Sequence, residues 1–413
     1  MKLRTVARPS ALLLCLVPLL ASPQQLPFQK PFKHSTPTHA SSQQENFSPY
    51  SIPWIAQLQT IYNTFGVSEN GTCPTEIQKW SCQPYELTEK DWDKPTDVWH
   101  LRPHDIKSVV SIGDSITAGF AMLTGRPPFA IALEYRGKVF SDGGDSEEYT
   151  LANFLRTYTK DIHGSPRGFT LPLAQGKGLN TGVSGAIVQM LPWQVERLRL
   201  LFGRFGPYRK YKNEWKLATI LIGANNLCDA CGLGGAFPAL SDPEKYGAAL
   251  KSALRRLKGS IGPTFVNLVG IFDVTLVYDL SRGHPYCEML LGTLPICSCA
   301  TGSEANRQKA GYLAKKYNEV MERIAKEINE ENKDDGTFGV VFQPGLTGFK
   351  EGASQFGQGY LSKFDCFHPN KCANQVMAIT LWNNMFSSPE DKKTPFRPKD
   401  LEIYCPGRND YLR

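Results

Sequence analysis

Apolar runs that alternate with amphipathic stretches constrain the fold of this 413-residue chain more than any other feature of its sequence. The longer stretches carry apolar residues at helical spacing, whereas the short runs are typical of buried strands. Strands that alternate with helices indicate a parallel sheet covered by helices. The sequence therefore predicts an α/β fold, a three-layer α/β/α arrangement with a mainly parallel sheet. Its candidate strands are 109–112, 218–222, 265–272 and 339–342.

Long helices are predicted in three of the amphipathic stretches. The first begins with Asp242 as N-cap and Pro243 at the first helical position. The second carries its apolar stripe from 313 to 328, and the third runs roughly over 370–386. We interpret these stripes as core packing. The stripe of the first helix consists of Tyr246, Leu250, Leu254 and Leu257.

The first 22 residues have the three parts of a secretory signal peptide. Three basic residues precede the apolar run 11–20, and small residues follow it at positions 21 and 22. The run is shorter than the roughly 20 apolar residues that a membrane span requires. No later stretch reaches that length, so we expect a secreted, extracellular protein without a membrane span.

Composition divides the remainder of the chain. Residues 23–50 are rich in Pro, Gln, Ser and Thr, which predicts a flexible N-terminal arm. Residues 51–413 are predicted to form a single domain. Its first segment, 51–104, contains four tryptophans but no long periodic run, and we expect it to wrap the main body.

Charge and cysteine content narrow the class of protein. The net charge of +7 includes three basic residues of the leader, and the remaining value of about +4 is weak for a chain of this size, so no nucleic-acid partner is indicated. Eleven cysteines less Cys15 of the leader leave ten, and disulfides are the default for an exported chain. Cys228 and Cys231 form a CxxC, for which a zinc or redox site is the weaker alternative. Glycosylation sequons at Asn46 and Asn70 fit the same location.

The motif SIGDSITAGF places Asp114 and Ser115 directly after the first predicted strand. In an open parallel sheet, ligands bind outside the carboxyl ends of the strands, so polar residues there are candidates for a site. Ser115 is a candidate nucleophile, and Asp114 is expected to support the turn. Because Ser and Asp are also favoured helix N-caps, a capping role for Ser115 is the alternative.

Two further motifs offer hydrogen-bond donors for an anion. The sequence GLNTGVSGA puts Asn180, Gly182 and Gly185 ahead of a helix-like run, where backbone N–H groups can face a developing negative charge. A plain glycine turn is the alternative. The sequence TILIGANNLC presents Asn225 at the same sheet edge, where its amide can donate to an oxyanion. A turn-forming asparagine is the alternative there.

A fourth motif, FDCFHPN, supplies an acid and a base. Asp365 precedes His368 by three residues on one loop, so its carboxylate can hold the imidazole in the tautomer that accepts a proton. With Ser115, these residues make a set suited to acyl transfer. No GxSxG occurs, which disfavours the nucleophile elbow of the α/β-hydrolases.

These motifs resemble those of the GDSL or SGNH hydrolases. The four marker residues of that family match Ser115 in GDSIT, Gly185 in NTGVSGA, Asn225 in IGANN and His368 in DCFH. The sequences EYRG with GGD nearby, LIGANNLCDAC, the cysteine cluster 287–299 and FDCFHPN followed by TLWNNMF resemble the animal phospholipase B branch.

That closer resemblance covers about residues 98–406, with one departure from the family pattern. Asn226 stands where the family usually has Asp. We expect this to disturb a turn hydrogen bond and to leave Asn225 in place.

The resemblance implies an SGNH hydrolase fold of flavodoxin-like type and hydrolysis of acyl esters in phospholipids and lysophospholipids. It implies no metal or other cofactor, and peripheral contact with lipid aggregates. The residues to which it gives catalytic roles are Ser115, Asp365, His368, Gly185 and Asn225. A general carboxylesterase or lipase with the same triad remains an alternative, with 122–135 as the candidate segment for acyl specificity. A catalytically inactive lipid-binding protein is the other alternative.

Overall fold

The structure is a computed structural model that describes residues 73–88, 95, 97–126, 132–231, 238–294, 296–351, 357–392 and 398–413. The predicted signal peptide, the predicted arm and the sequons at Asn46 and Asn70 lie outside the described residues. The domain limits therefore remain a prediction. Within the described part of the chain, no helix is long and apolar enough to cross a membrane.

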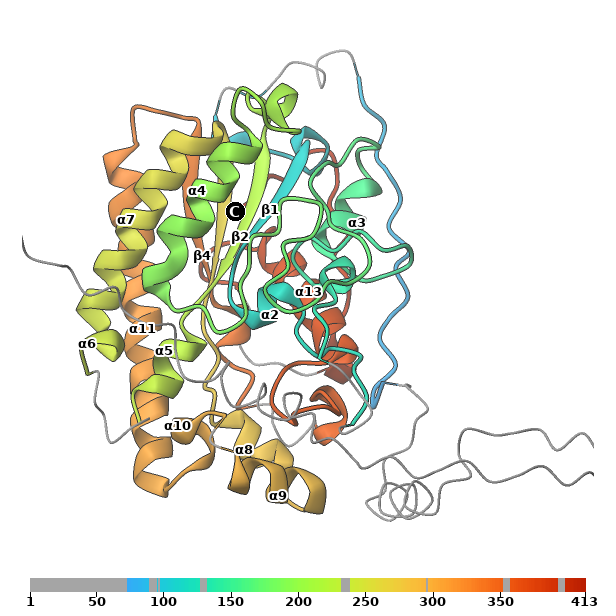
Figure 1. Ribbon diagram of the computed structural model, residues 1–413. Coiled ribbons are helices and arrows are strands. Elements are labelled where there is room, and N and C mark those ends of the chain that lie inside the picture. The colour runs from blue at the N-terminus through green and yellow to red at the C-terminus, as the bar shows by residue number, and fades with distance from the viewer. Residues whose placement is uncertain are drawn as a thin grey trace, which may run out of the picture. The chain divides into compact units, whose positions relative to one another are not determined.

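Within the described residues, four parallel strands form one sheet in the order β1-β2-β3-β4. Every residue of β1, β2 and β3 is buried, which is typical of parallel strands covered on both faces. The predicted α/β class and parallel sheet are confirmed (Figure 1). The strands are β1 (Ser108–Gly113), β2 (Lys216–Leu221), β3 (Thr264–Val269) and β4 (Phe338–Gln343).

The third strand ends three residues earlier than the sequence predicts. Its last residue is Val269, and the Gly270 N–H still bonds the carbonyl of Gln343 in β4. The Ile271 N–H then donates to the side chain of Asn318 at 2.8 Å. The apolar run continues to Phe272 because that residue packs into the core after leaving the ladder.

An extended stretch of chain lies along the outer edge of β1. Its pairs are isolated parallel bridges, Ser108 with His163 and Ser111 with Asn180. The chain therefore leaves β1 for this edge and returns past β1 to form β2, so the winding reverses at β1. Ligands of open α/β sheets bind outside the carboxyl ends of the strands at such a point, and Asp114 alone separates Ser115 from the end of β1.

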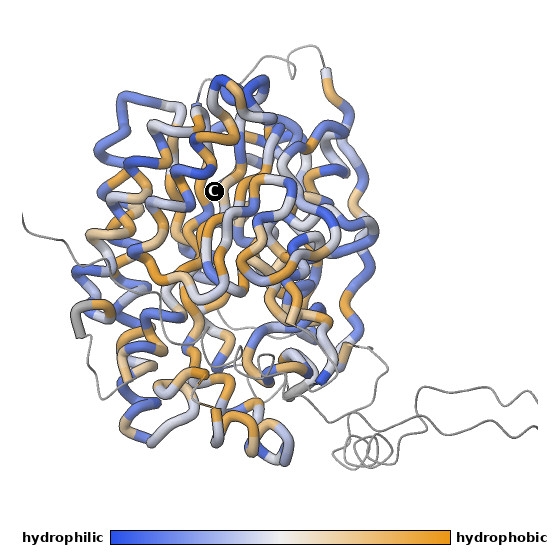
Figure 2. The backbone as a smooth tube through the Cα atoms, in the orientation of Figure 1, coloured by the Kyte–Doolittle hydropathy of each residue, from blue (hydrophilic) through white to orange (hydrophobic). Residues whose placement is uncertain are grey.

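Helices cover both faces of the sheet (Figure 1). The first predicted helix is α7, where the Asp242 side chain caps the Lys245 N–H as expected. Figure 2 shows hydrophilic and hydrophobic stretches alternating along α7 and α11, as amphipathic helices require. One face carries α4 (Leu191–Leu201), α7 (Pro243–Ile261) and α11 (Glu304–Glu331), and the other carries α3 (Leu151–Arg156) and α13 (Lys371–Asn384).

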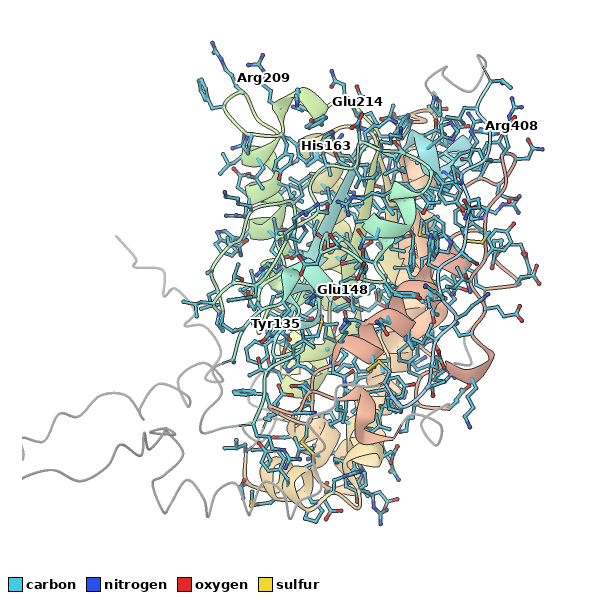
Figure 3. The ribbon with its side chains drawn as sticks, turned by 90° about the vertical axis from the view of Figure 1, so that its right-hand side faces the viewer. Tyr135, Glu148, His163, Arg209, Glu214 and Arg408 are labelled. Carbon is cyan, nitrogen blue, oxygen red and sulfur yellow. A yellow bond between two sulfur atoms is a disulfide. The ribbon has the colours of Figure 1, made fainter. Side chains whose placement is uncertain are left out.

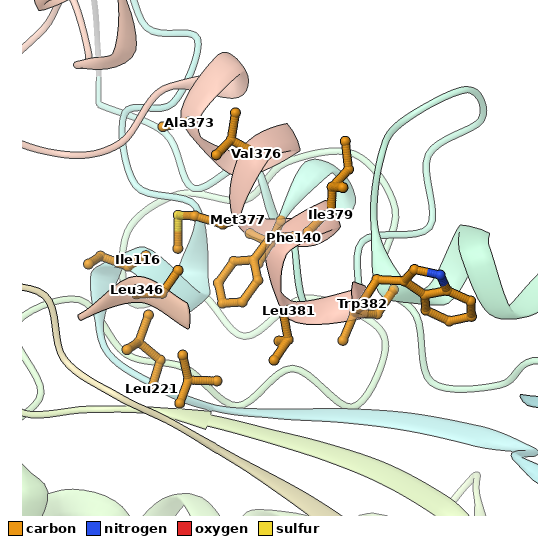
Figure 4. Packing of buried hydrophobic residues seen from close by; sticks show 14 of the residues in the cluster. Ile116, Phe140, Leu221, Leu346, Ala373, Val376, Met377, Ile379, Leu381 and Trp382 are labelled. Atoms are coloured by element: carbon orange, nitrogen blue, oxygen red, sulfur yellow. The ribbon is translucent and has the colours of Figure 1, made fainter. Parts of the chain in front are cut away.

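Helix α13 is buried on nearly all sides and packs on the second face of the sheet. Figure 4 shows Phe140 between α13 and the strands, with Met377 and Leu381 of the helix beside it. Each of these side chains is at most 2% exposed, and burial of one such side chain contributes about 1.5 to 3 kcal/mol. The helix thus gives a rigid support to the loop that immediately precedes it.

The described part of segment 51–104 lies against α3 and α13. The ring of Trp80 stacks on Phe154 with centroids 4.2 Å apart. Two disulfides, Cys73–Cys372 and Cys82–Cys405, join the segment to α13 and to the C-terminal stretch. This described part therefore covers the helical layer that supports the site.

Short helices fill the connections between the longer elements. The remaining α-helices are α2 (Ser115–Ala118), α5 (Ala224–Asp229), α6 (Pro238–Ser241), α8 (Leu276–Ser281), α9 (Pro285–Thr293) and α10 (Ser298–Thr301). Single 3₁₀ turns are η4 (Val98–His100), η5 (Pro103–Asp105), η6 (Arg136–Lys138), η7 (Val188–Met190), η8 (Arg209–Tyr211), η10 (Pro344–Leu346), η11 (Gln358–Tyr360) and η12 (Pro398–Asp400).

Candidate active site

The side chains of Ser115, His368 and Asp365 form a continuous hydrogen-bonded chain beyond the carboxyl end of β1. His368 Nε2 lies 2.7 Å from Ser115 Oγ, and His368 Nδ1 lies 2.5 Å from Asp365 Oδ2. An ionised carboxylate only accepts hydrogen bonds, so Asp365 fixes the proton on Nδ1 and leaves Nε2 to accept from the hydroxyl. The structure thus brings together three residues predicted from two distant motifs.

Ser115 is the first residue of α2, and Asp114 caps that helix. The Asp114 carboxylate accepts a hydrogen bond from the Ile116 N–H at 3.0 Å. Gly119 ends the helix after one turn in the left-handed region, at φ 72°. Asp114 therefore supports the turn as predicted, and the Ser115 hydroxyl is directed to His368 rather than used as a cap.

Burial has a strong effect on Asp114. Its side chain is almost fully inaccessible, and among the described residues its Oδ2 has no hydrogen-bond partner. Burial raises the pKa of Asp114 to about 6, although the Ile116 N–H and the charge of His368 act in the opposite direction. This carboxyl is therefore partly protonated near neutral pH.

Asp365 is also buried, but its surroundings favour the ionised form. Burial alone would raise the pKa of Asp365, yet the charge and hydrogen bond of His368 hold it below its usual value. The backbone N–H groups of Phe367 and His368 add two hydrogen bonds to Oδ1, at 2.9 and 3.0 Å. Asp365 therefore stays charged at neutral pH and can stabilise an imidazolium on His368.

A disulfide fixes the loop that carries the acid and the base. Cys366 lies between them in sequence and is bonded to Cys287 of α9. The Ser362 hydroxyl, at the start of this loop, donates to the carbonyl of Ala121 at 2.8 Å. These two links hold the loop against α9 and against the segment that follows α2, which limits motion of His368.

The two predicted oxyanion donors come from different elements, Gly185 from a loop and Asn225 from the first turn of α5. Gly185 has φ 80°, a conformation that favours glycine, and a Cβ added there would meet no described atom within 4 Å, so the backbone faces open space. Asn225 of α5 donates its side-chain amide to the carbonyl of Ala186 at 2.8 Å. The second hydrogen of that amide is not used in this bond. Asn225 lines the same cleft as Ser115 and His368.

The other residues of the GLNTGVSGA motif support the loop. The side-chain oxygen of Asn180 accepts a hydrogen bond from the Gly182 N–H at 3.1 Å. The side-chain amide of Asn180 donates to the carbonyl of Thr117 at 2.8 Å. The Gly182 N–H is therefore committed within the loop. Asn180 joins the loop to α2, which carries the serine.

A buried ion pair that contacts this loop is not among the predicted site residues. Arg136 and Glu134 are each at most 1% exposed and lie 2.6 Å apart. Arg136 donates to the carbonyl of Gly182 at 3.0 Å, and Glu134 accepts from the Ser184 hydroxyl at 2.6 Å. The pair thus fixes the chain immediately before Gly185. Two opposite charges two residues apart in EYRG are the signal in the sequence.

Asn226 does not disturb its turn, contrary to expectation. Its side-chain oxygen accepts from the Val188 N–H at 3.0 Å, and its amide donates to Gln189 and to the carbonyl of Leu240, at 3.1 and 2.8 Å. A carboxylate could not make the last two bonds, because it has no hydrogen to donate. The amide is fully satisfied, and Asn225 keeps its place in the cleft.

The cleft beside Ser115 is mainly apolar. The ring of Phe120 also packs against His368, with centroids 4.9 Å apart. Such a site offers a few polar groups within apolar walls, which is typical of pockets for small organic groups. Its apolar lining includes Ile116, Ala224, Phe272, Val274, Val277 and Phe367.

The cysteines of the CxxC motif are not available as metal ligands. Cys228 is bonded to Cys297, and Cys231 is bonded to Cys299. Within the described residues, all ten cysteines pair in five disulfides, which confirms the prediction that they are oxidised. Five disulfides fit an extracellular protein.

The profile of the GDSL-like lipase/acylhydrolase family matches residues 109–381, the span that holds the serine, the acid and the base. The chain belongs to this family. Membership places it among the ester hydrolases and confirms the predicted family and enzyme class.

Relatives of known name include the membrane-associated phospholipase B1 of Homo sapiens, which is 28% identical over 392 residues. That match covers 91% of this chain and 25% of the human protein. The Rattus norvegicus protein of the same name is 31% identical, over 76% of this chain and 22% of its own length. This chain thus spans about a quarter of the length of these relatives.

Among solved structures, an acetylxylan esterase from Geobacillus stearothermophilus is 16% identical to this chain, with a TM-score of 0.39. The match covers 70% of this chain and 98% of the esterase.

Replacing Asp114 by Asn should stabilise the protein in a pH-dependent manner. Burial raises the pKa of this carboxyl from 3.8 to about 6, so its ionisation opposes folding. The cost develops as the pH rises from about 4 to about 6 and persists above that range. The free energy of unfolding of Asp114→Asn should exceed that of the parent by about 2 to 3 kcal/mol at pH ~8 and equal it at pH ~4. Urea unfolding at both pH values measures this, and the same difference at both would contradict the raised pKa.

Proposed function

We propose that this chain is a secreted serine esterase that hydrolyses acyl esters of phospholipids and lysophospholipids. The observation that carries the proposal is the hydrogen-bonded chain from Asp365 through His368 to Ser115, beside an apolar cleft. The names of the phospholipase B1 relatives support the substrate class. The disulfides and the predicted signal peptide support secretion.

In the first half of the reaction, Ser115 Oγ attacks the carbonyl carbon of the ester. His368 Nε2 takes the hydroxyl proton as the new bond forms, and Asp365 stabilises the imidazolium that results. The negative charge passes to the former carbonyl oxygen. His368 then gives its proton to the departing alcohol oxygen, which leaves an acyl group on Ser115 and a free alcohol or lysolipid.

The developing oxyanion needs donors that are already oriented. We assign them to the backbone N–H groups of Gly185 and Ser115 and to the side-chain amide of Asn225. The hydrogen bond from Asn225 to Ala186 and the Glu134–Arg136 pair would fix these donors before substrate binds. Donors held in place in this way cost no reorganisation at the moment of reaction.

In the second half, water replaces the alcohol. His368 takes a proton from the water, the hydroxide attacks the acyl carbon, and the same donors hold the second oxyanion. His368 then returns the proton to Ser115 Oγ, which releases a fatty acid and restores the enzyme. During both halves the apolar wall formed by Val274, Val277 and Phe272 would hold the acyl chain.

The Asn225→Ala variant should lower kcat by about 10² to 10³-fold, because it removes one oxyanion donor. Its fold should be retained, since the lost bond to the Ala186 carbonyl is a single one at a partly exposed site. Gln308→Ala is the matched control, because Gln308 is exposed on α11 and its amide also makes one hydrogen bond, to the Glu304 side chain. Initial rates on a soluble ester measure both variants. Unchanged turnover in Asn225→Ala would remove the residue from the mechanism.

The substrate class can be tested with three esters offered to the same preparation. We expect release of fatty acid from phosphatidylcholine and from lysophosphatidylcholine, and release of nitrophenol from p-nitrophenyl acetate. The Ser115→Ala variant is the control and should release none. Hydrolysis of the acetate alone would favour the general carboxylesterase, and hydrolysis of none by a folded sample would favour an inactive lipid-binding protein.

A further inference from the structure

A short segment beside the site exposes large apolar side chains. Phe169 and Leu171 are 62% and 61% exposed, and both flank Thr170, whose backbone exchanges two hydrogen bonds with that of Glu134, at 2.8 and 2.9 Å. Side chains alternate along an extended chain, so the neighbours of Thr170 lie on the opposite side from it. The Thr170 hydroxyl faces inward and accepts a hydrogen bond from Arg136, which leaves Phe169 and Leu171 facing solvent.

Leu173 makes the same segment more unusual. A turn closes from the Ala174 N–H to the carbonyl of Leu171 at 3.0 Å, with Pro172 second and Leu173 third. Leu173 adopts φ 66°, in the left-handed region that favours glycine. The leucine is 45% exposed, so burial does not compensate for this strain. Such strain in an exposed apolar residue points to a role outside the folded chain itself.

The segment lies close to the reactive residues. Thr170 bridges Glu134, and Glu134 bridges Phe120, so three extended stretches lie side by side. Paired strands lie about 5 Å apart, so Thr170 lies about 10 Å from Phe120. The ring of Phe120 packs on His368. The ring of Phe169 packs toward that of Tyr135, with centroids 6.1 Å apart. Figure 3 shows Tyr135 in the lower half of the molecule, far from Arg209 at the top.

Positive charge flanks the apolar residues. Arg167 and Lys177 are exposed on either side of them, and the sequence contains no acidic residue between positions 162 and 178. Two carboxylates of neighbouring stretches, Glu134 and Asp145, are already paired. Glu134 is buried against Arg136, and Asp145 lies 3.4 Å from Lys138.

We propose that Phe169, Leu171 and Leu173 form an interfacial loop that inserts into the surface of a phospholipid aggregate. Arg167 and Lys177 then lie at the level of the head groups, where they attract anionic lipids. Apolar side chains below a rim of basic residues are the pattern by which proteins lie on a membrane surface. The inference rests on the proposed function, because the loop would hold the cleft of Ser115 at the lipid surface from which its substrate comes.

The binding test uses full-length protein with Ser115→Ala, so that vesicles are not degraded. Sedimentation with vesicles of phosphatidylcholine and phosphatidylserine should show binding, and Phe169→Ser/Leu171→Ser/Leu173→Gly should weaken it at least tenfold. Leu200→Ser/Phe205→Ser is the matched control, because these side chains are 60% and 92% exposed but precede the start of β2, at the opposite end of the sheet. Its binding should be unchanged. Equal binding by the parent and the triple variant would overturn the proposal that this loop inserts into lipid.

A separate variant tests the role of the two basic residues, Arg167 and Lys177. Arg167→Gln/Lys177→Gln should weaken binding to the anionic vesicles by up to about fivefold per charge. Binding to vesicles of phosphatidylcholine alone should not change. Equal losses on both kinds of vesicle would contradict a role for charge.

Activity separates this inference from the proposed function. In the Ser115 background, the triple variant should hydrolyse p-nitrophenyl acetate, a soluble ester, at the parent's rate. Its hydrolysis of phospholipid in vesicles should fall at least tenfold. If the parent hydrolysed neither substrate, the proposed function would be refuted. If the parent and the triple variant hydrolysed vesicles equally, only the proposed role of the loop would be refuted. If light scattering showed a dimer that the triple variant disrupts, and vesicles bound neither protein, the segment would be an interface between copies of this chain.

Discussion

The hydrogen bond between His368 and Ser115 joins residues 253 positions apart in the chain, and the site depends on it. The fold provides for that contact from two directions. Strand β1 delivers the serine at the point where the winding of the sheet reverses, and the loop before α13 delivers the histidine. Helix α13 is buried so thoroughly that this loop has a fixed base. A contact between two such distant segments is preserved only because both are attached to rigid elements.

Two buried carboxyl groups beside the imidazole of His368 have pKa values that are shifted in opposite directions. Burial raises the pKa of Asp114 in spite of the hydrogen bond from the Ile116 N–H, whereas the pKa of Asp365 lies below its usual value because His368 and two N–H groups offset burial. The difference separates a residue that shapes a turn from one that can stabilise positive charge. The Glu134–Arg136 ion pair supports the other side of the site. It holds the loop of Gly185 in place and does not itself contact Ser115.

Patterns of neighbouring residues predicted much of this arrangement. The strand runs, the cap at Asp242 and the Asp365–His368 spacing are local, so the sequence displays them directly. The end of β3 was misplaced because Phe272 is as apolar inside the core as it would be in a ladder. Other features depend on contacts between distant segments, which spacing alone does not reveal. They are the disulfide partner of Cys366, the support that EYRG gives to the Gly185 loop, and the hydrogen bonds that satisfy the Asn226 amide.

Covalent labelling of Ser115 with a fluorophosphonate tests the central claim most directly, because the reagent reacts with a serine only where a base activates it. Peptide mapping of the folded, full-length protein should find the label on Ser115. The rate should fall by more than about 10³-fold when His368 is replaced by Ala. A folded protein that remains unlabelled at Ser115, or one that is labelled as fast without the imidazole, would show that the hydrogen-bonded chain does not activate the serine.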